Sequence, residues 1–122
     1  MARRIDYPTL RAALWTLRAL WVTRLQLRRG VIEGVRVPSP PKLPETAIRG
    51  VRAVLRRRPN TCLERSLVLQ RWAARFGSAP DVVVGITGPA SSFRAHAWLD
   101  GELEGADEPF HELLRLPSAE RR

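Results

Sequence analysis

The chain has 122 residues, of which 44% are hydrophobic and 27% are charged, so it is long enough for one folded domain and is not a disordered chain. Its single cysteine excludes an internal disulfide framework and fits a reducing compartment. The formal charge of +9 is uneven, because residues 1–60 carry 14 basic and 3 acidic side chains (+11) whereas residues 61–122 carry 7 and 9 (−2).

The first predicted helix covers residues 8–29, with Pro8 in its first turn and Gly30 just past its last turn. Apolar residues at helical spacing predict one buried stripe along it: Leu10, Leu14, Leu17, Trp21 and Leu25. Trp15 and Val22 lie off that stripe and form a second apolar surface, which could pack within the domain or meet another protein.

The same segment does not read as a membrane span. Arg11, Arg18 and Arg24 interrupt it, so no window reaches the roughly 18 uncharged apolar residues that a spanning helix needs. No small-residue cleavage site follows a clean hydrophobic segment. We therefore expect a cytoplasmic protein without a membrane span.

A proline-rich connector is expected next, because Pro38, Pro40, Pro41 and Pro44 exclude a helix between residues 31 and 44. Residues 45–58 return to helical spacing, with apolar side chains inward, arginines outward and one weakening residue, Gly50. We expect residues 1–44 to be an N-terminal helix and connector that pack on the core or dock a partner, and residues 45–122 to form the core.

The second half predicts a helix over residues 61–76, closed by Gly77, and then strands. Strands are expected at 81–87, at 93–99 and, after the hairpin signal Asp100-Gly101, at 102–106. Residues 110–116 are expected to be a short closing helix or an irregular segment. The result is an α+β domain, with N-terminal helices followed by a central Cys-bearing helix packed on a small antiparallel sheet.

The residues that can carry chemistry are Cys62, His96 and Asp107. Cys62 begins the third expected helix, whose free amide groups stabilise a thiolate. His96 lies in the second strand, on the face that also carries Arg94 and Trp98. Cysteine, histidine and aspartate in this order suggest a nucleophile, a base and a carboxylate that orients the base.

The third member of this set is the least defined. The expected hairpin places His96 opposite Gly105, so Asp107 lies diagonal to it on the same face. Glu104 points the other way, and Glu108 has the wrong parity unless the strand bulges, yet both are neighbouring acids that could replace Asp107.

Each of these residues also has an ordinary structural explanation. A lone cysteine is often a small buried hydrophobe, and a strand histidine or a turn aspartate is usually structural. Ser66 could line the site or pack beneath it, and Asn60 could cap the helix or donate to an oxyanion. His111 is interpreted as a surface residue. No zinc-ligand spacing, phosphate loop or dinucleotide fingerprint occurs, so we expect no metal and no cofactor.

Two segments carry a family resemblance: residues 62–69 (CLERSLVL) and residues 93–99 (FRAHAWL), followed by a short hairpin. Over roughly residues 55–116 the chain resembles the lasso-peptide leader peptidases in their stand-alone form, which are transglutaminase-like cysteine proteases. The resemblance implies a papain-like or transglutaminase-like fold and a protease with Cys62 as nucleophile, His96 as base and Asp107 as orienting acid.

The resemblance also implies a substrate and partners. The substrate would be a ribosomally made lasso-peptide precursor, whose leader is removed with the help of a separate leader-binding protein before a cyclase closes the macrolactam. We expect the basic first half to dock this partner and the leader. Two alternatives remain: a nucleic-acid-binding module without catalysis, and an acyltransferase on the same scaffold. The resemblance argues for the peptidase, with no nucleic acid bound.

Overall fold

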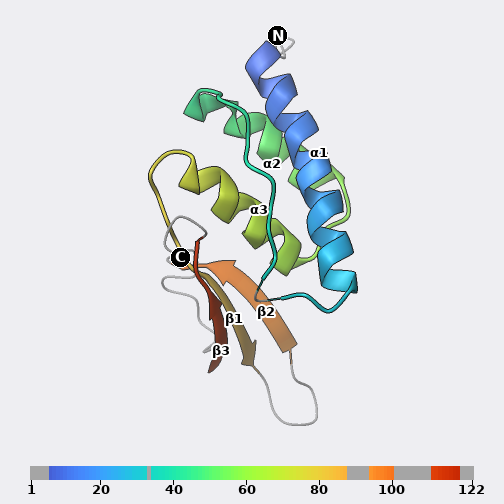
Figure 1. Ribbon diagram of the computed structural model, residues 1–122, viewed down its shortest axis with the longest axis vertical. Coiled ribbons are helices and arrows are strands. Elements are labelled where there is room, and N and C mark those ends of the chain that lie inside the picture. The colour runs from blue at the N-terminus through green and yellow to red at the C-terminus, as the bar shows by residue number, and fades with distance from the viewer. Residues whose placement is uncertain (1–5, 33, 88–93, 101–110, 119–122) are drawn as a thin grey trace. The chain divides into compact units, whose positions relative to one another are not determined.

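The structure is a computed structural model that describes residues 6–32, 34–87, 94–100 and 111–118 (Figure 1). The chain divides into two compact units, Met1–Asn60 and Thr61–Arg122. The first unit contains α1 (Tyr7–Arg28), the 3-10 turn η1 (Glu45–Ala47) and α2 (Ile48–Arg57). The second contains α3 (Cys62–Ala74) and the strands β1 (Val82–Thr87), β2 (Arg94–Leu99) and β3 (His111–Leu116). The α+β class is confirmed.

Helix α1 begins at Tyr7, one residue before the predicted start, and Asp6 caps it. The Asp6 carboxylate accepts a hydrogen bond from the Thr9 amide at 2.9 Å, and Pro8 occupies the first turn. The hydrogen bonds from Thr9 hold the pKa of Asp6 below its ordinary value. This contribution to stability is therefore present above the ordinary pKa of an aspartate and lost as the pH falls through the lowered value. No helix within the described ranges is long and apolar enough to cross a membrane.

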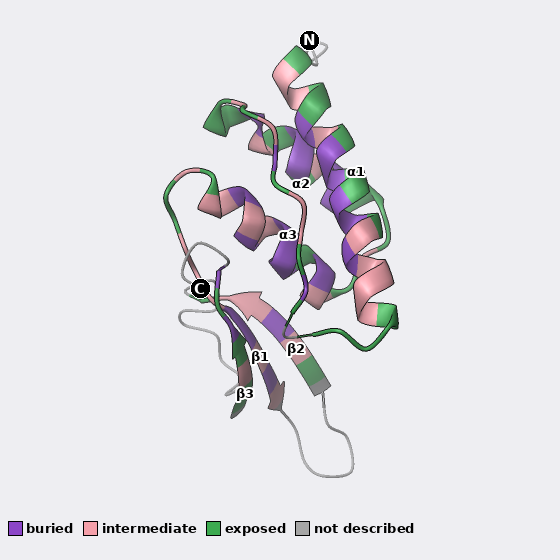
Figure 2. Ribbon diagram, in the orientation of Figure 1, coloured by how far each residue is buried: buried purple, intermediate pink, exposed green. Residues whose placement is uncertain are grey.

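The buried side of α1 is not the predicted one. Leu10, Leu14 and Trp21 are 47%, 58% and 62% exposed, so the expected buried stripe was wrong. The buried side consists mostly of small residues and is visible as the purple side of the helix in Figure 2: Ala12, Trp15, Thr16, Ala19, Leu20 and Thr23. Small side chains let neighbouring segments approach the backbone closely, and helical spacing alone does not reveal which of two apolar sides does so.

The close neighbour of α1 is α2, and Gly50 lies at their contact. A Cβ atom built on Gly50 would lie 2.1 Å from the Thr9 carbonyl oxygen and 3.0 Å from the Ala13 amide nitrogen. The missing side chain therefore lets the two backbones touch. The inward apolar side chains of α2 are confirmed by buried Val51 and Val54, and its arginines are exposed as predicted.

The proline-rich connector is tied to α1 by side chains. Gln26 exchanges two hydrogen bonds with the backbone of Arg36, both at 2.9 Å. The Trp15 indole donates to the Pro38 carbonyl at 3.1 Å. Trp15 is 7% exposed, so packing within the domain accounts for this residue and it is not part of a partner surface.

In the second unit, α3 packs mainly on β2, which fits the expected cysteine-bearing helix on a small sheet. Leu67, Val68 and Trp72 are buried, and Gly77 follows the helix with a φ of +81°, the left-handed conformation that favours glycine. The helix ends at Ala74, close to the predicted boundary.

The described sheet is antiparallel with the strand order β2-β1-β3. Both Val82 and Val83 are buried, as expected of the central strand. Residues 111–116 form β3, so the expected closing helix or irregular segment was wrong, and His111 begins a strand. The expected strand at 102–106 lies outside the described residues.

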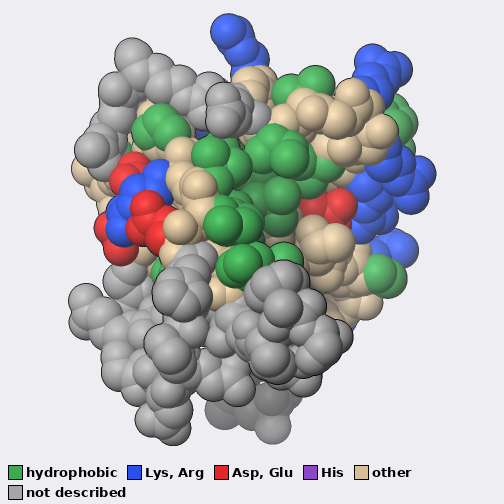
Figure 3. All heavy atoms as spheres, turned by 90° about the horizontal axis from the view of Figure 1, so that it is seen from below, with side chains coloured by type: hydrophobic (Ala, Val, Ile, Leu, Met, Phe, Trp, Pro, Cys, Tyr) green, Lys and Arg blue, Asp and Glu red, His purple; other side chains and the backbone are tan. Residues whose placement is uncertain are grey.

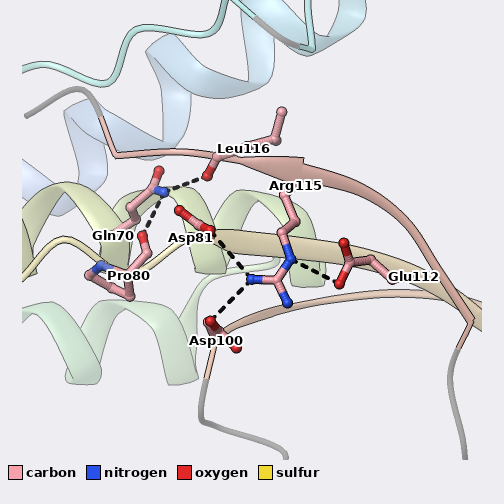
Figure 4. A network of polar contacts seen from close by, with 7 residues as sticks. All are labelled: Gln70, Pro80, Asp81, Asp100, Glu112, Arg115 and Leu116. Carbon is pink, nitrogen blue, oxygen red and sulfur yellow. Dashed lines mark hydrogen bonds and ion pairs between the residues drawn. The ribbon is translucent and has the colours of Figure 1, made fainter. Parts of the chain in front are cut away.

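The strand β3 was hard to predict because its alternation is broken. The β1–β3 register shifts between Val84 and Gly85, so Leu113 is an extra residue with 62% exposure. Gln70 fixes the far end of the strand by donating to the Leu116 carbonyl at 2.8 Å and to the Pro80 carbonyl at 2.9 Å (Figure 4). Tertiary contacts therefore define this strand more than its local pattern does.

Candidate functional site

Cys62 is the first residue of α3, and a capping box fixes the turn that carries it. The Thr61 hydroxyl accepts a hydrogen bond from the Glu64 amide at 3.1 Å, and the Glu64 carboxylate accepts one from the Thr61 amide at 3.0 Å. Glu64 is 4% exposed, so this pair is shielded from water. The thiol thus stands at a rigid helix N-terminus, where amide groups favour negative charge.

The Cys62 thiol lies against β2. Its Sγ accepts a hydrogen bond from the Ala97 amide at 3.3 Å. The Asp100 amide donates to the Asp81 carbonyl of the neighbouring strand, and alternation along β2 then directs the Ala97 amide away from β1. The sulfur therefore lies at the outer edge of β2, where it takes an amide hydrogen that the described sheet leaves unpaired.

The same contact brings the thiol close to the backbone of His96. Because the Ala97 amide is joined directly to His96, standard backbone geometry puts the His96 Cα within about 6 Å of the sulfur. The imidazole stacks on Trp98, with ring centroids 6.0 Å apart and planes at 22°, which confirms that these two residues share a face. His96 is half-buried. The sulfur of the predicted nucleophile therefore lies close to the backbone of the predicted base.

Gly85 is a feature of this face that the sequence pattern did not single out. It pairs with His96 on one side and with Glu112 on the other, so no side chain stands between them in the register. The Glu112 carboxylate accepts a hydrogen bond from Arg115 Nε at 2.9 Å. A glycine inside an otherwise apolar strand is the one sequence signal that could have indicated this missing side chain between His96 and Glu112.

The predicted third member, Asp107, lies outside the described residues, as do Glu104 and Glu108. The structure therefore joins the thiol to the histidine strand but does not bear on the carboxylate. The assignment of Asp107, with Glu104 or Glu108 as its replacement, stays a prediction.

Two further candidates are assigned to structural roles. The Asn60 amide donates to the carbonyls of Leu55 and Arg58, both at 2.8 Å, so it closes the end of α2 and is not an oxyanion donor. The N-cap of α3 is Thr61 and not Asn60. Ser66 is fully buried and its hydroxyl has no hydrogen-bond partner in the described structure, so it packs beneath the site.

Arg115 connects all three strands on the face that carries His96. It contacts Glu112 at 2.9 Å, Asp100 at 3.1 Å and Asp81 at 3.3 Å (Figure 4). The hydrogen bonds to Glu112 and Asp100, followed by that to Asp81, raise the pKa of Arg115 above its ordinary value. The cation is therefore held in its charged form and supports the sheet. In the described part of the chain no three His, Cys, Asp or Glu side chains are grouped as metal ligands.

The capping box gives a first testable prediction. Thr61→Ala removes the hydroxyl acceptor and should lower the free energy of unfolding by about 1 kcal/mol, the usual cost of losing such a cap. Thr61→Ser keeps the acceptor and should retain most of the stability. Urea denaturation of the three proteins measures both effects. Equal losses in the two variants would mean that the hydroxyl is not what holds the first turn of α3.

Comparison with known proteins identifies the scaffold. The model of a family described as the transglutaminase-like superfamily matches residues 9–112, which is most of the chain. Comparison with curated proteins and with solved structures finds no significant match. The family match spans both units and includes Cys62 and His96.

Proposed function

Because the chain belongs to the transglutaminase-like superfamily, whose scaffold serves cysteine peptidases and acyltransferases, we propose that it is a cysteine peptidase that removes the leader from a lasso-peptide precursor. The observation that carries the proposal is the 3.3 Å contact between the Cys62 sulfur and the Ala97 amide, next to His96. A thiol at a helix N-terminus, on the backbone of the strand that carries a histidine, supports a role in nucleophilic catalysis.

In this proposal Cys62 Sγ attacks the scissile carbonyl of the precursor while His96 accepts the thiol proton. The oxyanion that forms is stabilised by the first amides of α3. His96 then gives the proton to the departing amine, which leaves a thioester between Cys62 and the leader. A water molecule, deprotonated by His96, hydrolyses the thioester and frees the thiol. Asp107 would orient the imidazole.

The Ala97 amide adds a fixed donor to the sulfur. A hydrogen bond to a thiolate is charge-assisted and stronger than one to a thiol, so the 3.3 Å contact favours the reactive form. A donor that belongs to the strand backbone is held in place by the sheet.

The substrate and partners follow from the family resemblance. The leader would be presented by a separate leader-binding protein, and the released core peptide would pass to a macrolactam-forming cyclase. We propose that the first unit, whose residues 1–60 carry a net charge of +11, docks the partner.

A second candidate is an acyltransferase, which the superfamily match equally favours. Both reactions share the thioester on Cys62, and they differ only in whether water or an amine resolves it.

Mass spectrometry of a candidate precursor, incubated with its leader-binding protein and this chain, tests the proposal. We expect two fragments whose combined mass exceeds that of the precursor by one water. A leader fragment that carries an added amine would instead identify an acyltransferase. An intact precursor, with the partner present and bound, would contradict both.

A further inference from the structure

A groove runs between α1 and α2 within the first unit, with a volume of about 570 Å³. Apolar side chains from both helices line it, including Leu10 and Leu17 of α1 and Val54 of α2. Arginines of α2 line the same groove, among them Arg52 and Arg56. An apolar floor beside several cations is an unusual surface for a chain to leave open to water.

Leu10 and Leu17 of the groove also belong to an exposed apolar stripe on α1. Its members are spaced by three and four residues in strict alternation: Tyr7, Leu10, Leu14, Leu17 and Trp21. All are at least 36% exposed. This spacing is that of the contact positions a and d of a coiled coil, so the stripe is suited to receive a second helix along its length.

The charges of the groove specify the partner further. Arg49 lies 3.7 Å from the Asp6 carboxylate. No ion pair joins the side chains of Arg52, Arg56, Arg57 or Arg58 to another described residue. The face drawn in Figure 3 has lysine and arginine side chains along one edge, in keeping with the net charge of +9. These four cations lie beside an apolar stripe and have no described counter-ion. They complement a helix that has leucine-type residues on one side and carboxylates along its flanks.

We propose that this α1–α2 groove docks an acidic amphipathic helix of a protein partner. The inference rests on the proposed function only in that such a partner would deliver the substrate. A second copy of the chain is disfavoured as the partner, because its arginines would repel the arginines of the groove. A bilayer fits a flat or convex surface better than a groove. A nucleic acid would bring phosphates for the arginines but no apolar side chains for the leucines.

Fluorescence anisotropy with a synthetic three-heptad peptide tests the proposal. The peptide carries leucine at a and d and glutamate at e and g, so that its own charges keep it monomeric. We expect the full chain to bind it, and to bind a scrambled peptide of the same composition at least about tenfold more weakly. Arg52→Glu together with Arg56→Glu should weaken binding at least about tenfold, because two attractions become repulsions.

Matched variants separate the groove from general effects of charge and apolar surface. Arg36→Glu changes an exposed arginine of the same unit that does not line the groove, and it should weaken binding less than twofold. Leu10→Ser should weaken binding, whereas Leu113→Ser, at a leucine of β3 that is more exposed than Leu10, should not. Circular dichroism establishes that each variant is folded.

Three results would overturn the proposal: no binding of the acidic peptide, binding that the groove variants leave unchanged, and preference for another ligand through the same residues. The last is tested with phosphatidylserine vesicles, with duplex DNA and by sedimentation for a dimer that Leu10→Ser dissociates. Running the assay with Cys62→Ala separates the two proposals, because peptide binding does not need the thiol. Precursor cleavage without groove binding would refute this inference and leave the peptidase standing.

Discussion

Replacing Cys62 with alanine should abolish precursor cleavage and leave the fold intact. The thiol is the proposed nucleophile, and removing such a group lowers turnover by up to roughly 10⁶-fold in enzymes that depend on one. Cys62 is only half-buried, and within the described residues its polar contact is the hydrogen bond that it accepts from Ala97, so folding should not depend on it. Cleavage is measured by mass spectrometry with the leader-binding partner present, and folding by urea denaturation.

Ser66 provides the matched control for that experiment. It lies one helical turn after Cys62, and its hydroxyl is buried without a hydrogen-bond partner in the described part of the molecule. Ser66→Ala removes an unpaired polar atom, so it should be neutral or slightly stabilising and should retain cleavage. Cleavage that survives Cys62→Ala, or that disappears equally in Ser66→Ala, would contradict the assignment of the nucleophile.

The helices were predictable because strong local signals mark their ends. Pro8 predicted the start of α1 to within one residue, although the Asp6 cap was not identified, and Gly77 follows α3 with the positive φ that its type favours. The sequence also placed Cys62 at a helix start, although it took Asn60 for the cap in place of Thr61. Both residues are good caps by type, and only the Thr61–Glu64 pair distinguishes them.

The contacts between elements were less predictable. The predicted buried side of α1 was wrong because both sides of the helix are apolar. The side that is buried carries small residues such as Ala12 and Ala19, which allow close backbone packing that helical spacing does not reveal. The strand β3 was missed because its bulge at Leu113 breaks the two-residue alternation. In each case the decisive partner lies far away in the sequence.

For the candidate site, the pairing of Cys62 with His96 stays a prediction, and the structure shows only that the sulfur contacts the strand that carries His96. Strand alternation predicted that His96 and Trp98 share a face, and the stacked rings confirm it. The hydrogen bond from Ala97 to the sulfur was not predictable, because it depends on which edge of β2 meets α3. Asp107 stays a prediction.

Gly50→Ala should destabilise the first unit, although alanine has the higher intrinsic helix propensity. In an open helix, Gly→Ala is stabilising by up to about 1 kcal/mol. Here the added Cβ would lie 2.1 Å from the Thr9 carbonyl oxygen, a backbone atom that cannot rotate away. The helices α1 and α2 would have to separate, and overpacking of this kind costs about 1–3 kcal/mol. We therefore expect Gly50→Ala to lower the free energy of unfolding by about 2 kcal/mol, as measured in urea.

The control is Gly34→Ala, since the nearest atom to an added Cβ there is Val31 Cγ1 at an ordinary 3.8 Å. This variant should be neutral or slightly stabilising, because it reduces the entropy of the unfolded chain and causes no steric clash in the folded chain. If Gly50→Ala instead raised the free energy of unfolding, propensity would outweigh packing at that position. Such a result would contradict the close contact between Gly50 of α2 and the Thr9 carbonyl of α1.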